Sequence, residues 1–180
     1  MRLIASFISA SATLLVVAAG CGAGASPEEK WADSVCSSIG DWKSQVQQAK
    51  DDISTKLSSP GTGTLTAVNT DVRNAVDATN KLATDLKAIG PPDTEKGAQA
   101  KQQVDALATQ LQSTASTAKQ TVNSVPANST LVETAQKLAP LAPALESLDT
   151  AASSALASVK ESSAALKEGF DKADSCKQFR

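Results

Sequence analysis

The sequence contains no histidine and no tyrosine, and its aromatic side chains are limited to two Trp and three Phe. Without histidine the chain lacks the base of Ser-His-Asp triads, the commonest zinc and haem ligand, and the Glu-x-x-His motif of di-iron bundles. Basic and acidic residues nearly balance, with 17 Lys+Arg against 19 Asp+Glu and a formal net charge of −2. This balance argues against a nucleic-acid-binding surface. We therefore expect no enzyme activity, no cofactor, no metal centre and no nucleic-acid partner.

The N-terminal residues 1–20 have the form of a secretory signal peptide. Arg2 is followed by an apolar run from Leu3 to Ala19 and then by small residues, which is the order of such a segment. Because the run ends in flexible, uncharged residues, we expect cleavage and not a permanent membrane span. Residues 21–26 then form a flexible tether, and residues 27–180 form a single helical domain.

The sequence Ala-Ala-Gly-Cys at residues 18–21 resembles the bacterial lipobox, although Ala18 replaces the usual Leu. The resemblance implies that Cys21 becomes the new N-terminus and carries acyl chains such as palmitate. Two or more chains give stable anchoring, so we expect a lipoprotein held by Cys21 on the extracytoplasmic side of the cell membrane. An alternative is cleavage after Ala25, within an A-x-A pattern, which would release a secreted protein.

The remaining cysteines, Cys36 and Cys176, lie at opposite ends of the mature chain. Disulfides persist outside the cytoplasm, and with Cys21 acylated these two residues allow one pairing. We expect a Cys36–Cys176 disulfide. The alternative is a pair of independent thiols.

Apolar residues recur at helical spacing in four segments, and no segment shows sustained strand-like alternation. The pattern predicts an all-α fold. The expected core stripes are Trp31, Val35, Ile39, Trp42, Val46, Ala49, Ile53 and Leu57; Leu65, Val68, Val72, Ala75, Thr79, Leu82, Leu86 and Ile89; Ala100, Val104, Leu107, Leu111, Ala115, Ala118, Val122 and Val125; and Leu138, Leu141, Leu145, Leu148, Ala152, Ala155, Val159, Leu166 and Phe170.

Capping and breaking residues mark the ends of these segments. Ser26 with Pro27 predicts the first helix start, and Thr130 with Glu133 forms a second capping box. Gly90, followed by two prolines, predicts the C-cap of the second helix. The third helix is expected to start at Asp93 or Thr94 and to stop at Pro126.

Long helices joined by short loops place neighbouring helices antiparallel. We therefore predict an up-down-up-down antiparallel four-helix bundle. Pro140 and Pro143 each remove a backbone hydrogen bond, so we expect the fourth helix to kink or restart there on one axis and then to continue through Phe170.

Three aromatic residues, Trp31, Trp42 and Phe170, are candidates for a ligand or partner site. The first interpretation is that they pack in the core. The second is that an Ala-lined gap beside Trp42 holds a small apolar ligand. The third is that they form an exposed patch for a protein partner.

Taken together, the lipobox Cys, the Trp-rich first helix with its early Cys36, the Gly-Pro-Pro at residues 90–92 and the C-terminal Cys176 resemble small helical lipoproteins of actinobacteria. The resemblance implies an envelope location and transfers no catalytic residue. The sequence thus predicts a lipid-anchored, non-enzymatic binding or interaction module of the cell envelope. The alternative is a carrier or sensor for a small apolar ligand held between the helices.

Overall fold

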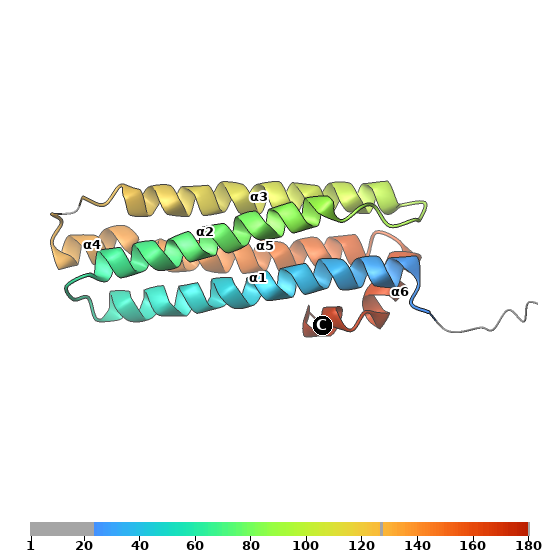
Figure 1. The fold of residues 1–180 in the computed structure, drawn as a ribbon, viewed down its shortest axis with the longest axis horizontal. Coiled ribbons are helices and arrows are strands. Elements are labelled where there is room, and N and C mark those ends of the chain that lie inside the picture. Colours follow the sequence, from blue (N-terminus) through green and yellow to red (C-terminus); the bar gives the residue numbers. More distant parts are fainter. Residues whose placement is uncertain (1–23, 127, 180) are drawn as a thin grey trace, which may run out of the picture.

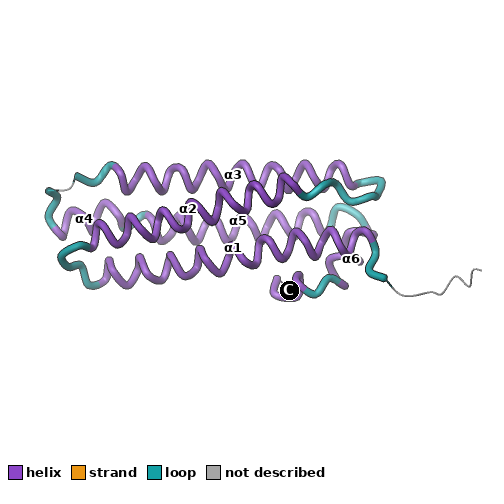
Figure 2. The backbone as a smooth tube through the Cα atoms, in the orientation of Figure 1, coloured by secondary structure: helices purple, strands orange, loops and turns teal. Residues whose placement is uncertain are grey.

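The computed structural model describes residues 24–126 and 128–179, so the predicted signal peptide and Cys21 lie outside the described residues. Within these ranges every regular element is a helix, which confirms the predicted all-α class (Figures 1 and 2). The elements are α1 (Pro27–Ser58), α2 (Thr64–Ala88), α3 (Gly97–Asn123), α4 (Leu131–Leu138), α5 (Leu141–Lys160), α6 (Ala164–Lys172) and the 3-10 helix η1 (Ser175–Phe179). None of these helices is long and apolar enough to cross a membrane.

The long helices lie side by side along the longest axis of the molecule (Figure 1). α2 packs against α1 and α3, and α5 packs against α3 and α1. The turn between α1 and α2 lies at the same end as α4, whereas α6 and the start of α1 lie at the other end (Figure 1). The described chain therefore begins and ends near one extremity of an elongated body.

The apolar stripes form a continuous core, as their spacing predicts. In α1 the stripe from Trp31 to Ile53 is buried, and Leu57 at its end is partly buried. The stripes of α2, α3 and α5 face it, with Leu82, Leu111 and Leu148 among the side chains that are almost fully enclosed. Burial of this kind is the main stabilising contribution to such helices.

Two predicted helix starts are confirmed by their capping hydrogen bonds. The Ser26 side chain accepts from the backbone N–H of Glu29 at 3.1 Å, with Pro27 in the first turn. Thr130 and Glu133 form the reciprocal capping box at α4. The backbone N–H of Thr130, donating to the Glu133 carboxylate, holds the pKa of that carboxyl below its ordinary value.

The end of α2 and the start of α3 differ from the prediction. α2 ends with an extended Ile89 as its C-cap, and of the described residues only Gly63 has a positive φ, so Gly90 is not a left-handed cap. α3 begins at Gly97 instead of at Asp93 or Thr94. A Cβ at Gly97 would lie 1.9 Å from the Pro92 carbonyl oxygen, so the close passage of the preceding loop sets this start.

The proline interruption occurs where the sequence predicts it. α4 ends at Leu138, and Pro140 serves as the N-cap of α5, with Pro143 inside its first turn. A proline in a first turn costs no helix hydrogen bond, because the first N–H groups have no partner within the helix. Figure 1 shows α5 continuing from α4 toward the opposite end of the molecule, partly behind α1 and α2.

The predicted extension of this helix through Phe170 is wrong. α5 ends at Lys160, and Ser163 caps a new helix by accepting from the backbone N–H of Leu166. α6 then packs mainly on α1, not along the axis of α5 (Figure 1). The reversal buries Leu166 and Phe170 against the start of α1, which a straight continuation of α5 would not do.

Candidate functional site

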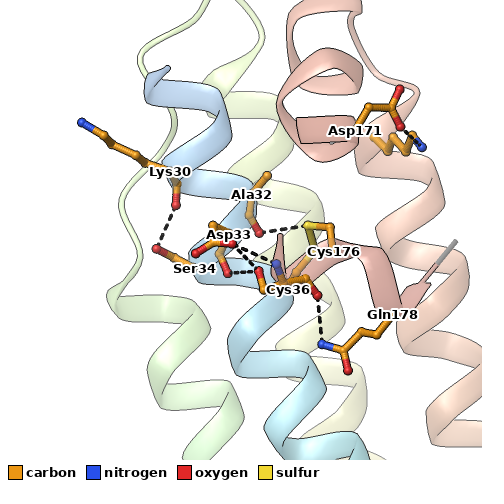
Figure 3. Close-up of a disulfide and its surroundings, with 10 residues drawn as sticks. Lys30, Ala32, Asp33, Ser34, Cys36, Asp171, Cys176 and Gln178 are labelled. Atoms are coloured by element: carbon orange, nitrogen blue, oxygen red, sulfur yellow. Dashed lines mark hydrogen bonds and ion pairs between the residues drawn. A yellow bond between two sulfur atoms is a disulfide. The ribbon is translucent and has the colours of Figure 1, made fainter. Parts of the chain in front are cut away.

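The predicted disulfide is present, and it ties the C-terminal segment to the first helix (Figure 3). Cys36 belongs to α1 and Cys176 to η1, with 5.0 Å between their Cα atoms. We call residues 164–179, which comprise α6 and η1, the C-terminal strap. The chain reverses direction after α5. The disulfide therefore joins α1 to this strap and not to the end of a long helix.

The strap lies on a row of small residues on α1. Ala32, Cys36 and Gly40 follow one another at four-residue spacing and are buried beside the main stripe. A Cβ at Gly40 would lie 2.2 Å from the Gln178 side chain, and one at Gly169 would lie 2.8 Å from the backbone of Glu28. Small side chains on both surfaces therefore allow the close approach.

Polar contacts hold the strap as well. The Asp33 carboxylate accepts from the Ser175 backbone N–H at 3.0 Å and from its hydroxyl at 2.7 Å, and the hydroxyl also reaches the Asp33 carbonyl (Figure 3). Between α5 and α6, Lys160 pairs with Asp171 at 2.6 Å. All of these groups are exposed to solvent at least in part, so each contact is individually weak.

The three candidate aromatic residues are buried, which contradicts the hypothesis of an exposed partner patch. Trp31, Trp42 and Phe170 retain 6%, 2% and 4% of their surface. Trp31 donates its indole N–H to the Gly90 carbonyl at 2.7 Å and meets Phe170 edge-on, with ring centroids 6.1 Å apart. Gly90 and Phe170 are distant from Trp31 in the sequence and meet it only in the folded protein. The three aromatic residues are therefore part of the core.

Trp42 occupies the middle of α1 and makes a fully buried polar contact. Its indole N–H donates to the Thr79 hydroxyl at 3.0 Å, and that hydroxyl donates to the Ala75 carbonyl at 2.7 Å. The indole N–H of Trp42 and the hydroxyl hydrogen of Thr79 both have an acceptor, as burial requires. Trp42 therefore joins α1 to α2 by both packing and hydrogen bonding.

An Ala-lined gap is present between α2, α3 and α5, and Trp42, beside which the sequence predicts it, is not among its lining residues. Its lining includes Ala75, Thr79, Ala115 and Ala118, and its volume is about 0 Å³, so it has no room for even one water molecule. Drug-sized ligands occupy pockets of about 300–1,000 Å³. This gap offers no place for a small apolar ligand.

A surface hollow of about 230 Å³ opens beside the disulfide. Both cysteines line it together with Leu156, Phe170 and Phe179, and Ser153, Lys160 and Glu161 contribute its polar lining. The Phe179 ring is held by Lys43, whose ammonium lies 5.8 Å from the ring centroid and 2.9 Å from the Asp149 carboxylate.

A second surface hollow runs between α1 and α2. Two adjoining hollows of about 460 and 260 Å³ share Gln45, Ala78 and Lys81, so they form one groove. We call it the polar groove. Its polar lining includes Asp41, Gln45, Gln48 and Asp52 from α1, and Asp71, Asn74, Asp77, Lys81 and Asp85 from α2.

Negative charge predominates in the polar groove. Five carboxylates line it, and Lys81 is the one cation among its lining residues. The hydrogen bond to Asp85 raises the pKa of Lys81, and the nearby charge of Asp41 raises it further. Asp52 and Asp77 make no ion pair within the described part of the chain.

The sequence held a signal for this groove that the stripe analysis did not use. Asp41, Gln45, Gln48 and Asp52 repeat at steps of four, three and four, in parallel with the apolar stripe. Residues at this spacing share one face of a helix. The spacing on one helix does not show that the face becomes a groove, because α2 supplies the other wall.

Metal binding has no support in residues 24–126 and 128–179, where no group of three or more His, Cys, Asp and Glu side chains could hold a metal ion. Comparison of the chain with models of known protein families, with curated proteins and with solved structures found no match.

Proposed function

We propose that this protein is a lipid-anchored, non-enzymatic interaction module of the cell envelope, resembling small actinobacterial lipoproteins, in which an antiparallel four-helix bundle presents the polar groove to a protein partner. Two features support the bundle. The turn of residues 59–63 between α1 and α2 is short, and α5 packs against both α3 and α1, which completes a ring of four neighbours. Up-down-up-down connections are the simplest way to join such a ring.

The anchor is proposed from the lipobox-like residues before Cys21. Residues 22–26 would then separate the acylated Cys21 from the start of α1. At a rise of about 1.5 Å per residue, the 32 residues of α1 would carry the far end of the body well away from the membrane. The groove on α1 and α2 would remain accessible to proteins of the envelope.

Replacing Cys21 by Ser should move the protein from the membrane to the aqueous phase, because the acyl chains supply the anchoring. Phase partitioning in detergent, followed by intact-mass measurement, tests this expectation. Membrane retention of the Cys21→Ser variant would mean that an uncleaved signal segment holds the protein instead. A soluble protein whose mass begins at Ser26 in the unaltered chain would support the secreted alternative.

The absence of enzymatic activity is proposed from the chemistry of the chain. Many Ser and Thr hydroxyls donate to carbonyls one turn earlier in their own helix, as Thr109 and Ser158 do. The sequence has no histidine, which is the commonest base that activates such a hydroxyl as a nucleophile.

The observation that carries the proposed interaction is the polar groove. Its unpaired carboxylates and the amides of Gln48 and Asn74, which make no hydrogen bond within the described part, point into one hollow. Groups of this kind favour a partner that carries Lys or Arg side chains, because complementary charge steers association and fixes the register. We therefore propose a basic segment of an envelope protein as the occupant.

Asp52→Lys tests the groove, with Asp51→Lys as its matched control. Asp52 lines the groove and Asp51 does not, and both residues are exposed. Cross-linking in intact cells should capture a basic partner with the unaltered protein and with Asp51→Lys. Asp52→Lys should lower the yield by about tenfold, because a like charge opposes the partner. Equal yields from the two variants would contradict a role for the groove and leave the Cys21 result unaffected.

A further inference from the structure

We propose that the Cys36–Cys176 disulfide is a redox latch: a small dithiol reaches it in the folded protein, and reduction lets the C-terminal strap open as a unit separate from α1–α5. This proposal concerns the strap and does not depend on the polar groove or on its partner. It assigns to the disulfide a reaction with an external thiol in addition to its contribution to stability.

Access to the sulfur atoms comes through the hollow of about 230 Å³ beside the disulfide. Cys36 and Cys176 both line this hollow, although as residues they retain 0% and 3% of their surface. Burial of this extent closes the disulfide to a protein-sized reductant, and we infer that the hollow is the route by which a small molecule reaches Cys176. Exchange rates depend on this kind of access as well as on thiol chemistry.

The reaction is an ordinary thiol–disulfide exchange with a dithiol as the reductant. A thiolate of the dithiol attacks Sγ of Cys176, which is the less deeply buried of the two residues. The S–S bond breaks, and its electron pair leaves on Sγ of Cys36, which takes a proton from water. The second thiol of the reductant then attacks the mixed disulfide and releases Cys176 as a thiolate, which is protonated in turn. The protein gains two electrons and two protons, and the dithiol becomes a cyclic disulfide.

The surroundings of Cys176 suit the reduced form. Its Sγ lies 3.4 Å from the Ala32 carbonyl oxygen (Figure 3). A disulfide sulfur has no hydrogen to donate, whereas the reduced thiol can donate a weak hydrogen bond to this carbonyl.

After reduction, the strap is held only by its noncovalent contacts with its neighbours. It packs mainly on α1 and only slightly on α5, and the turn at residues 161–163 connects it to α5. Its polar contacts, Ser175 with Asp33 and Asp171 with Lys160, are partly exposed. The strap buries Leu166 and Phe170 on α1, but it forms an outer layer beside the four long helices, and such a unit opens locally at a free energy below that of global unfolding.

Opening would uncover the row of Ala32, Cys36 and Gly40 on α1 together with one side of Trp31. The α1–α2–α3–α5 core would stay closed, because each of these four helices keeps its contacts with two neighbouring long helices, none of which involves the strap. The reduced protein would therefore differ from the oxidised protein in one surface and not in its overall fold.

The test is native-state reduction of the processed protein, extracted from its own membrane in detergent, with dithiothreitol as the probe. Alkylation with iodoacetamide reports reduction, and hydrogen exchange by mass spectrometry reports opening. We expect reduction without denaturant, and exchange of residues 164–179 should then accelerate at least about tenfold while α1–α5 keep their protection. The double variant Cys36→Ser, Cys176→Ser should show the same local acceleration without reductant.

Access through the hollow is tested with Ser153→Phe and its neighbour Ser154→Phe. Both residues are exposed on α5, and only Ser153 lines the hollow. Ser153→Phe should slow native reduction by about tenfold, whereas Ser154→Phe should leave the rate unchanged. Resistance to dithiothreitol until the protein unfolds would overturn the proposal. Equal rates for the two variants, unchanged exchange in the reduced strap, or loss of protection throughout α1–α5 would each overturn it as well.

Discussion

Replacing either Cys36 or Cys176 by Ser should lower the free energy of unfolding by about 4–5 kcal/mol in the chain-entropy model of disulfide stabilisation. The reason is that the disulfide closes a loop of 140 residues, and a long cross-linked loop strongly restricts the unfolded chain. Domains of this size have a total stability of about 5–15 kcal/mol. The variants should therefore fold and have a clearly lower melting temperature.

The double variant Cys36→Ser, Cys176→Ser should be no less stable than either single variant, because the first substitution already removes the cross-link. Urea unfolding followed by circular dichroism measures all three free energies, and non-reducing mass spectrometry confirms the loss of the bond. Additive losses would show that the two side chains contribute separately through their packing. Such additivity would contradict loop closure as the main source of stabilisation.

Replacing Trp42 by Ala should cost about 3–5 kcal/mol, the range for removing a large aromatic side chain from a core. Trp42 retains 2% of its surface and joins α1 to α2 through its hydrogen bond to Thr79. The substitution leaves a cavity and removes the donor that the Thr79 hydroxyl accepts, while that hydroxyl keeps its own bond to Ala75. Intrinsic helix propensity acts in the other direction, since Ala is the better helix former, but its contribution is below about 1 kcal/mol.

Trp42→Phe separates packing from hydrogen bonding at this position. The smaller ring keeps most of the buried area and loses the N–H, so its cost should fall clearly below that of Trp42→Ala. Thr79→Val provides the reciprocal variant, because it leaves the indole N–H buried without an acceptor, at about 1–3 kcal/mol. Urea unfolding with tryptophan fluorescence from Trp31 or Trp42 measures the series. A loss of less than about 1 kcal/mol for Trp42→Ala would contradict the central position of this residue.

Much of the helical core was predictable because it depends on short-range periodicity. A residue such as Ile39 or Leu82 shares a face with neighbours three and four positions away, whatever the rest of the chain does. The caps at Ser26 and Thr130 are local for the same reason, since each side chain bonds to a backbone group three residues ahead. The pairing of Cys36 with Cys176 followed from the small number of cysteines.

The C-terminal strap was not predictable from the same pattern. Val159 and Leu166 are seven residues apart, a spacing of two helical turns that fits a straight helix as well as a reversal. Ser162 and Ser163 were the available signal, because Ser favours a helix start. What decided the outcome was the free surface on α1, where Ala32, Cys36 and Gly40 allow a second layer to pack closely.

The sequence by itself determined the helical class, the core stripes, the proline interruption and the cysteine pair, because each depends on local geometry or on residue count. Only the tertiary structure decided the reversal after Lys160, the contact of Phe170 with Trp31, and the polar groove between α1 and α2. Each of these features requires contact between two surfaces that are distant in the sequence. The free energy of that contact depends on both surfaces and cannot be read from either one alone. The apolar stripe of a helix predicts which of its residues are buried. Which helix packs against that stripe is determined only by the tertiary structure.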